Sequence, residues 1–376
     1  KLFFGTDMHI TDIRLQNFRN YADRTVELTE KVNLITGKNA QGKTNLLESI
    51  FVCCVGKSVR ARDRELIAHG QDRARIRMTA ERFEGRVQTE MVLSRGENKR
   101  ILVNGIPLSR TGELLGTVKA IYFSPEDLKL IKDAPDSRRR FLDMDLSQIY
   151  KNYYYALTRY NRALLSRNNL LKKYPEHTLP DLLYPYDVQL VKEGAKILKY
   201  RLEYVEKLKI TSKKVHSYLT SDEEELEISY ASNIPREGDI EANYAHALED
   251  SRDKDIKLKF TTAGVHRDDI KITANGLDIR IYGSQGQQRT AALSLKLAEL
   301  ELFEEISNDL PVLLLDDVFS ELDERRQRRL LEFCGTVQSV ITATHVDPGL
   351  LEGLPVAVYR VESGNVERLA GGEISD

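Results

Sequence analysis

The sequence predicts an α/β protein: a mixed sheet with flanking helices and an antiparallel β part, interrupted by an inserted helical arm. Three observations lead to this prediction. An apolar strand at Val32–Thr36 runs into a glycine-rich loop and then into a helix that begins near Asn45. A second apolar run, Val312–Asp316, follows Pro311 and fits a buried parallel strand. Between them, residues 138–218 carry apolar side chains at helical spacing, which indicates long helices.

The glycine-rich loop fits the pattern G-x-x-x-x-G-K-[ST], which is typical of a phosphate-binding loop. Its residues are Gly37, Lys38, Asn39, Ala40, Gln41, Gly42, Lys43 and Thr44. Glycines let backbone amides close around phosphate oxygens, and the positive end of the following helix favours negative charge. We expect Lys43 to reach the β- and γ-phosphates of a nucleotide and Thr44 to be a ligand of Mg²⁺. A glycine-rich turn that merely precedes a helix is the alternative that the loop by itself leaves open.

The other elements are predicted from local patterns. Residues 10–18 alternate as a strand with residues 24–28 as its partner, and residues 73–81, 86–95 and 100–103 form an antiparallel set. Residues 118–123 form a buried strand, and Ser124-Pro125 starts a helix. Three prolines within residues 174–185 separate two helical runs, and residues 222–225 form an acidic loop. After residue 257 we expect strands at 269–273, 277–281, 340–343 and 356–361, and a helix at 287–306.

These elements indicate two halves of one head domain around an insertion. We expect the first half at residues 8–135, the helical arm at residues 136–255 and the second half at residues 256–372. Residues 1–7 precede Met8 and the patterned sequence, and we expect them to be left over from protein expression.

The composition points to a globular protein, because 41% of the residues are hydrophobic and 30% are charged. No apolar run is long enough to span a bilayer, so we expect no membrane partner. Cys53, Cys54 and Cys334 are expected to be free thiols in a reducing compartment, which favours a cytoplasmic location.

The net charge of −2 does not indicate nucleic-acid binding by the chain as a whole, but the charge is uneven. Two basic segments are candidates for contact with a DNA backbone, because local patches bind polyanions even in a nearly neutral protein. The candidate residues are Lys57, Arg60, Arg62, Arg64, Arg138, Arg139 and Arg140. A solvated loop and helix face is the alternative for the first segment.

A phosphate-binding loop acts together with a carboxylate at the end of a neighbouring strand. We expect Asp316 to hold Mg²⁺ directly or through water, and Asp317 to orient or deprotonate an attacking water. With Lys43 and Ser284 they form the predicted catalytic set. The segment Ser284-Gln285-Gly286-Gln287 resembles the signature motif of ABC-type ATPases. A capping box that only starts a helix is the alternative, and both readings can hold.

The wide spacing between Lys43 and Asp316 differs from that of small kinases and GTPases and is typical of P-loop ABC-type ATPase heads with an inserted arm. Six motifs in this chain resemble those of the RecF family. They are Ile13-x-Leu15-x-Asn17-Phe18-Arg19-Asn20-Tyr21, the loop Gly37 to Thr44, Phe123-Ser124-Pro125-Glu126-Asp127-Leu128, Gly264-x-His266-Arg267-Asp268-Asp269, Ser284-Gln285-Gly286-Gln287-Gln288-Arg289 and Leu315-Asp316-Asp317-Val318-x-Ser320-Glu321-Leu322-Asp323. The resemblance runs from residue 10 to near residue 369. Residues 123–128 lack the glutamine that ABC ATPases usually carry there.

The resemblance to the RecF family implies a weak, DNA-stimulated ATPase that acts as a switch, with ATP and Mg²⁺ as cofactors. Two subunits would face each other head to tail, so that ATP forms a homodimer and hydrolysis releases it. Besides the loop, the nucleotide site would include Ser284, Gly286, Gln287, Asp323 of the D-loop and His345 near the switch-histidine position. The dimer would bind duplex DNA at single-strand gaps or junctions. RecR, with RecO, would then promote RecA loading in gap repair and the SOS response.

Three other functions fit parts of the sequence. An SMC-like ATPase of chromosome maintenance is the main alternative, but the arm is too short for a long coiled coil. A transporter ATPase subunit is disfavoured by the missing glutamine and by the helical insertion. A metabolite or nucleoside kinase is disfavoured by the wide motif spacing.

Overall fold

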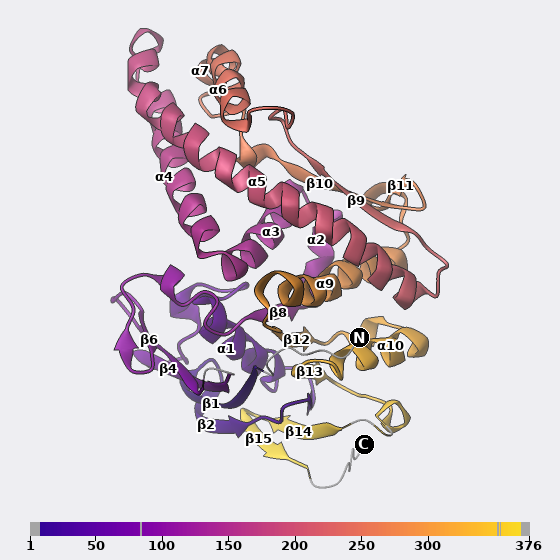
Figure 1. The fold of residues 1–376 in the computed structure, drawn as a ribbon. Coiled ribbons are helices and arrows are strands. Elements are labelled where there is room, and N and C mark those ends of the chain that lie inside the picture. Colours follow the sequence, from indigo (N-terminus) through magenta and orange to yellow (C-terminus); the bar gives the residue numbers. More distant parts are fainter. Residues whose placement is uncertain (1–7, 83–84, 352, 354, 370–376) are drawn as a thin grey trace. The chain divides into compact units, whose positions relative to one another are not determined.

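A computed structural model describes residues 8–82, 85–351, 353 and 355–369 (Figure 1). The chain divides into two compact units. The first comprises Lys1–Leu128, Lys214–Glu224 and Gln285–Asp376, and the second comprises Lys129–Lys213 and Glu225–Ser284. The boundaries that we expected at residues 135 and 255 therefore lie elsewhere, at Leu128 and Ser284. Residues 1–7 and 370–372, which entered the expected division, lie outside the described residues.

The first unit contains a six-stranded sheet in the order β15-β14-β3-β13-β12-β8. All neighbouring strands in it are parallel except β14 and β15. The strands are β3 (Val32–Thr36), β8 (Ala120–Phe123), β12 (Val312–Asp316), β13 (Ser339–Ala343), β14 (Val356–Glu362) and β15 (Asn365–Arg368). Every residue of β8, β12 and β13 is buried, which explains why these strands read as continuous apolar runs rather than alternating ones.

A second sheet of the first unit is antiparallel, with the order β2-β1-β4-β5-β6-β7. Its strands are β1 (His9–Phe18), β2 (Tyr21–Glu27), β4 (Arg73–Glu81), β5 (Val87–Ser94), β6 (Arg100–Val103) and β7 (Ile106–Pro107). One face is buried and the other is partly exposed, as the alternating burial along β5 shows. The sequence prediction of an antiparallel set is confirmed here, with β2 starting earlier than expected.

Three α-helices of the first unit carry the motifs: α1 (Lys43–Val55), α9 (Gln285–Ser307) and α10 (Glu324–Cys334). Helix α1 starts at the phosphate-loop lysine and is buried along most of its length. Short 3-10 helices of the described chain lie at Asp63–Glu65, Thr111–Glu113, Pro125–Leu128, Glu176–Thr178, Val265–Arg267, Phe319–Glu321 and Pro348–Leu350.

The second unit is mainly helical and carries a small sheet in the order β11-β10-β9. Its elements are α2 (Lys129–Lys132), α3 (Pro135–Ile149), α4 (Lys151–Lys173), most of α5 (Leu179–Thr220), β9 (Leu226–Ala231), α6 (Ile240–Asp250), α7 (Arg252–Leu258), β10 (Asp269–Ala274), β11 (Leu277–Asp278) and α8 (Ile279–Tyr282). Strand β10 pairs with β9, and this pairing is why residues 256–284 belong to the second unit. Our expectation that strands return only after residue 257 was wrong, because β9 precedes it.

Helix α5 begins within the segment where we expected prolines to break the helical pattern. Pro180 lies in its first turn, where a missing N–H costs no internal hydrogen bond. Pro185 lies inside the helix, so the predicted break is confined to the turn between α4 and α5. Helices α4 and α5 run side by side in opposite directions (Figure 1). No helix in the described part of the chain is both long and apolar enough to cross a membrane.

Candidate nucleotide site

The loop between β3 and α1 depends on glycine at two positions. Gly37 and Gly42 have φ angles of 144° and 120°, which residues with a side chain rarely adopt. A Cβ atom at Gly37 would collide with the carbonyl oxygen of Val361, and one at Gly42 would collide with the side chain of Asn20. Both glycines are therefore required by the packing around the loop as well as by its backbone angles.

The ammonium group of Lys43 is held by the loop itself. Its Nζ donates hydrogen bonds to the carbonyl oxygens of Gly37 at 2.5 Å and of Lys38 at 3.0 Å. Burial lowers the pKa of Lys43, and the negative charges of Asp317 and Asp316 oppose that shift. The lysine is thus next to the loop amides, where its charge favours an anion bound in the loop.

The carboxylate of Asp316 joins three parallel strands to helix α1 at the carboxyl end of the sheet. Its Oδ1 accepts hydrogen bonds from the hydroxyl groups of Thr44 at 2.8 Å and Thr342 at 2.7 Å. Its Oδ2 accepts one from Tyr122 at 3.2 Å. The two residues predicted to hold a metal, Thr44 and Asp316, are therefore in direct contact. A hydroxyl and a carboxylate are hard oxygen ligands of the kind that Mg²⁺ prefers, so this donor set fits that ion.

Sequence patterns did not identify Thr342 and Tyr122 as parts of this site. Their role depends on strand order: β13 and β8 flank β12, and Thr342 lies directly opposite Asp316. The sequence held one clue to both residues, which is their position. Each lies within one or two positions of the carboxyl end of a short apolar strand. Tyr122 directly precedes the segment 123–128, which lacks the glutamine, and its hydroxyl donates to the Asp316 carboxylate.

Asp317 turns the chain sharply out of β12. Its φ angle of 51° lies in the left-handed region, which is uncommon for a residue with a side chain. Its N–H donates to the carbonyl oxygen of Thr342 at 3.1 Å and to the hydroxyl of Thr342 at 3.0 Å. These two hydrogen bonds hold the unusual conformation. Strained backbone of this kind is concentrated at functional sites.

The chain beyond β13 returns to the phosphate-binding loop. The hydroxyl group of Thr344 donates to Oδ1 of Asn39 at 3.1 Å. His345 is the next residue and is exposed. Of the two residues at the expected switch position, Thr344 is therefore the one that contacts the loop in a single chain.

The signature-like and D-loop-like segments lie at the starts of two helices. Ser284 directly precedes α9, and the carbonyl oxygen of Gly286 accepts a hydrogen bond from Thr290 at 2.9 Å. Gln287 lies in the same first turn of α9. Asp323 caps α10, because its carboxylate accepts from the N–H of Arg326 at 2.9 Å. Asp323 thus has a structural role in the single chain, whatever else it contacts.

Two of the candidate DNA contacts pair with carboxylates of the chain itself. Nη2 of Arg60 lies 3.2 Å from a carboxylate oxygen of Glu48, which is buried. Arg138 is 5% exposed and pairs through Nε and Nη2 with Asp269, at 2.6 and 3.1 Å. We correct the expectation for Arg138, because binding a phosphate would leave the Asp269 carboxylate without its charged partner. Arg60 stays a candidate, because it is exposed and Glu48 also pairs with Arg19.

The other candidates differ in their surroundings. Arg139 donates to the carbonyl oxygen of Asp268 at 2.6 Å and also pairs with Asp136. The candidates that are exposed on the surface and stay proposed phosphate contacts are Lys57, Arg60, Arg62, Arg64 and Arg140.

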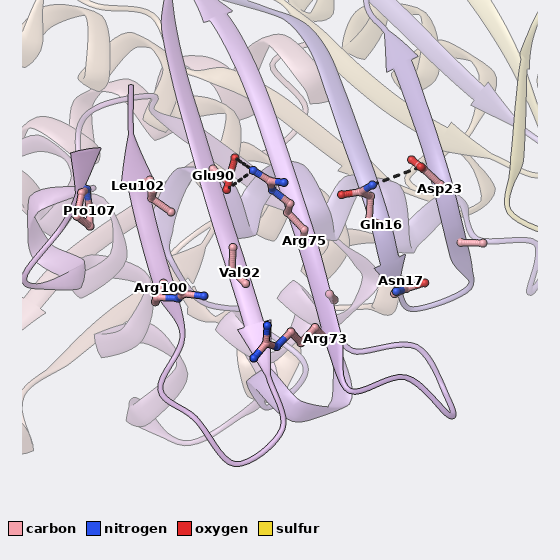
Figure 2. A pocket seen from close by; sticks show the side chains of 12 residues that line it. Gln16, Asn17, Asp23, Arg73, Arg75, Glu90, Val92, Arg100, Leu102 and Pro107 are labelled. Atoms are coloured by element: carbon pink, nitrogen blue, oxygen red, sulfur yellow. Dashed lines mark hydrogen bonds and ion pairs between the residues drawn. The ribbon is translucent and has the colours of Figure 1, made fainter. Parts of the chain in front are cut away.

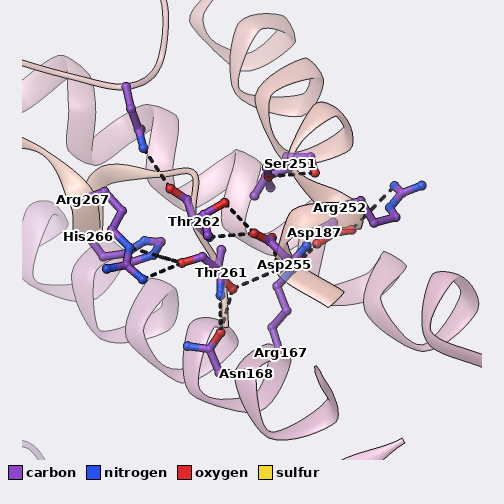
Figure 3. Close-up of polar contacts among 12 residues, drawn as sticks. Arg167, Asn168, Asp187, Ser251, Arg252, Asp255, Thr261, Thr262, His266 and Arg267 are labelled. Carbon is purple, nitrogen blue, oxygen red and sulfur yellow. Dashed lines mark hydrogen bonds and ion pairs between the residues drawn. The ribbon is translucent and has the colours of Figure 1, made fainter. Parts of the chain in front are cut away.

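One basic side chain of the arm, that of Arg167 in α4, is neutralised within the fold. Arg167 is fully buried, and its guanidinium bonds to Asp187 at 2.6 Å, Asp255 at 2.7 Å and Thr261 at 2.9 Å (Figure 3). These partners come from α5, α7 and the segment after α7. Arg167 therefore does not contribute to the positive charge on the surface of the second unit.

An open hollow of about 750 Å³ lies on the partly exposed face of the antiparallel sheet (Figure 2). Arg73 and Arg100 line it, and Arg75 pairs there with Glu90 at 2.8 Å. Among the described residues that line it, none belongs to the phosphate-binding loop. The hollow is therefore distinct from the nucleotide site.

Comparisons with known proteins agree with these motifs. A family model described as the RecF/RecN/SMC N-terminal domain matches residues 9–352. The DNA replication and repair protein RecF of Lachnoclostridium phytofermentans is 41% identical over 364 residues, which cover 96% of this chain and 100% of the relative. The chain belongs to the RecF family. The RecF protein of Clostridium perfringens is 42% identical over 368 residues, covering 98% of this chain and 99% of its own.

Solved structures of the RecF family share the fold throughout. A structure described as the recombination mediator protein RecF-ATP in the RecFOR pathway is 39% identical, with a TM-score of 0.89, and the match covers 98% of this chain and 100% of that one. The Smc head domain of Pyrococcus furiosus is 14% identical and has a TM-score of 0.57 over 96% of each chain, so it shares the fold alone. The predicted fold class, an ATPase-type α/β head with a helical arm, is confirmed.

Proposed function

We propose that this RecF-family protein binds ATP with Mg²⁺ at the loop Gly37–Thr44 and hydrolyses it slowly as a switch. The observation that carries this proposal is the 2.8 Å hydrogen bond between Thr44 and Asp316. It joins the end of the phosphate-binding loop to a carboxylate far away in the sequence. P-loop NTPases use this arrangement to hold Mg²⁺. The ATP complex of a relative that is 39% identical supports it further.

Each residue of the site has a distinct role in this proposal. The loop amides and Lys43 bind the phosphates, and Thr44 and Asp316 hold Mg²⁺. Bound Mg²⁺ would neutralise part of the phosphate charge and favour departure of the γ-phosphate. Thr342 and Tyr122 orient the Asp316 carboxylate, and Asp317 takes a proton from the attacking water while the bond to ADP breaks.

The signature-like segment acts across a head-to-tail homodimer in this proposal. Ser284, with Gly286 and Gln287, would contact the γ-phosphate held by the other subunit, and Asp323 and His345 would lie at the same junction. The exposed start of α9 suits this role because the N-terminal end of a helix favours anions. ATP binding would therefore shift a monomer–dimer equilibrium, and hydrolysis would reverse it.

We further propose that the ATP-bound dimer binds duplex DNA at gaps or junctions through sequence-independent phosphate contacts. The exposed candidates for those contacts are Lys57, Arg60, Arg62, Arg64 and Arg140. RecR, with RecO, would act with the bound dimer to load RecA in gap repair and the SOS response. This work on chromosomal DNA implies a cytoplasmic location. Support comes from relatives that are named as DNA replication and repair proteins.

Replacing Lys43 tests the proposed ATP site directly. In the wild type, ATP–Mg²⁺ at 100 times its Kd should stabilise the fold by about 2.7 kcal/mol. Lys43→Met should lose this stabilisation and the measured ATP affinity, because the charge opposite the phosphates is gone. Lys31→Met is the control, since Lys31 is an exposed lysine just before β3. Unchanged ATP affinity in Lys43→Met, by calorimetry, would overturn the proposal.

A further inference from the structure

Gln41 of the phosphate-binding loop is bound by a turn near the other end of the chain. The N–H of Ser363 donates to Oε1 of Gln41 at 2.7 Å, and the hydroxyl of Ser363 lies 3.4 Å from the same oxygen. The N–H of Gly364 donates to the main-chain carbonyl oxygen of Gln41 at 3.1 Å. The β14–β15 turn therefore holds both the side chain and the main chain of this loop residue.

A second turn contacts the same peptide group. Nδ2 of Asn20, in the β1–β2 turn, donates to the carbonyl oxygen of Gln41 at 2.8 Å, and Oδ1 of Asn20 accepts from Asn45 at 2.9 Å. Tyr21, next in the chain, donates its buried hydroxyl to the carbonyl oxygen of Gly42 at 3.0 Å. The loop carbonyls at positions 41 and 42 are thus occupied by donors from outside the loop.

The β1–β2 turn and the β14–β15 turn are also closely packed against each other. A Cβ atom added at Gly364 would overlap the carbonyl oxygen of Asn20, and one at Gly37 would overlap that of Val361, in β14. Phosphate binding needs loop amides that point inward, so the carbonyl oxygens must point elsewhere. The hydrogen bonds from Asn20 and Gly364 to the carbonyl oxygen of Gln41 satisfy that requirement for this peptide group.

We propose that Gln41 is a positioning residue, and that the β14–β15 hairpin (Val356–Glu362, Asn365–Arg368) is a brace that fixes the phosphate-binding loop in its ligand-ready shape. The side chain of Gln41 points to the turn at Ser363, so Gln41 acts through the loop backbone and makes no side-chain contact with the nucleotide. Asn20 and Gly364 are the two other positioning residues of this brace. This inference rests on the proposed ATP function, because it assigns a role in that same site.

Gly364→Ala tests the brace, and the chain offers a closely matched control. Gly364 follows Ser363 in a hairpin turn with φ angles of 76° and 47°, and Gly105 follows Asn104 in another with φ angles of 77° and 50°. The backbone strain of alanine is therefore the same at both glycines. A Cβ at Gly105 meets nothing within 4 Å, whereas one at Gly364 presses on Asn20. Any difference between the two variants reports on the contact with the β1–β2 turn.

We expect Gly364→Ala to weaken ATP binding at least about tenfold relative to Gly105→Ala, because small displacements of a binding loop have large effects. Gln41→Met keeps the length of the side chain, removes the acceptor for Ser363 and adds no strain; it should weaken ATP binding in the same direction. Each variant is measured by calorimetric ATP titration and by thermal melting without nucleotide. A lower melting temperature with an unchanged Kd for ATP would indicate a role in stability alone. A raised Kd for ATP would indicate a role in positioning the loop.

Equal ATP affinity in Gly364→Ala and Gly105→Ala, with wild-type binding intact, would overturn the brace and leave the proposed function standing. Weakened binding in Gln41→Met alone would also overturn it, because it would indicate direct contact between Gln41 and the nucleotide. Variants that melt earlier but bind ATP normally would reduce the hairpin to a stability element and contradict positioning. Failure of the wild type to bind ATP would overturn the proposed function itself.

Discussion

Glu48→Gln should destabilise the first unit strongly, because Glu48 is a buried carboxylate with several cationic and hydroxyl donors. Its two oxygens accept from Arg19 at 3.0 and 3.1 Å and from Ser58 at 2.5 Å, and Arg60 lies 3.2 Å away. The Glu48 side chain is 1% exposed, whereas those of Arg19 and Arg60 are 23% and 25% exposed. The change removes the negative charge and leaves two guanidinium groups without their counter-ion.

The burial of Glu48 sets the expected size of the destabilisation. Breaking a fully buried ion pair typically costs 3–5 kcal/mol, and partial exposure of both arginines reduces the expected loss to about 2–4 kcal/mol. Burial alone would raise the pKa of Glu48, but the hydrogen bonds from Arg19 and Ser58 and the positive charges lower it below its usual 4.5. A depressed carboxyl pKa contributes stability above the unfolded value, and this contribution is lost as the pH falls through the folded value. The destabilisation caused by Glu48→Gln should therefore have its full size at pH 7 and become smaller below about pH 4.5.

Urea denaturation at pH 7 measures this effect, with Glu97→Gln as the matched control. Glu97 pairs with Arg73 at 3.7 Å, and both side chains are more than half exposed, at 57% and 63%. An exposed pair of this kind is worth at most about 1 kcal/mol. A Glu48→Gln variant that loses no more stability than Glu97→Gln would refute the expectation that Arg19 and Arg60 depend on this buried carboxylate as their counter-ion.

Three further predictions concern the remaining motifs. Asp317→Asn should slow ATP hydrolysis roughly 100-fold and prolong the ATP-bound dimer, since the amide cannot take a proton; unchanged turnover would remove Asp317 from the chemistry. Ser284→Arg should keep ATP binding and lose ATP-dependent dimerisation in sedimentation velocity, and loss of ATP binding itself would speak against action across subunits. Burial lowers the pKa of His266 to about 4, with Thr261 accepting from its ring. Unfolding free energy should therefore fall by roughly 3 kcal/mol between pH 6.5 and 4, and His266→Gln should flatten that slope in urea titrations.

The loop and the carboxylate strand could be predicted from the sequence because each is encoded locally. The spacing of Gly37, Lys43 and Thr44 and the apolar run before Asp316 are visible within a few residues. Their contact, Thr44 to Asp316, followed from the chemistry that such motifs share. Thr342 could not be predicted in the same way, because its hydrogen bond depends on which strand lies next to β12.

Charge and helix predictions failed where distant segments compensate. Arg138 looked like a surface charge because its partner, Asp269, lies far along the chain. Pro185 suggested a break, yet α5 continues through it as part of a long helix packed over much of its length. Strand β9 was missed although Leu226, Ile228 and Tyr230 are buried in alternation, because the acidic run before it suggested a loop.

The central claim is that one chain holds half of an ATP site that a second copy completes. Light scattering with and without ATP–Mg²⁺ tests it most directly, and gapped duplex DNA is added in a second step. We expect a monomeric mass without nucleotide, a doubled mass with ATP–Mg²⁺, and retention of DNA by the doubled species. A mass that is the same with and without ATP–Mg²⁺ would contradict it, and Ser284 would then be only the residue that precedes α9.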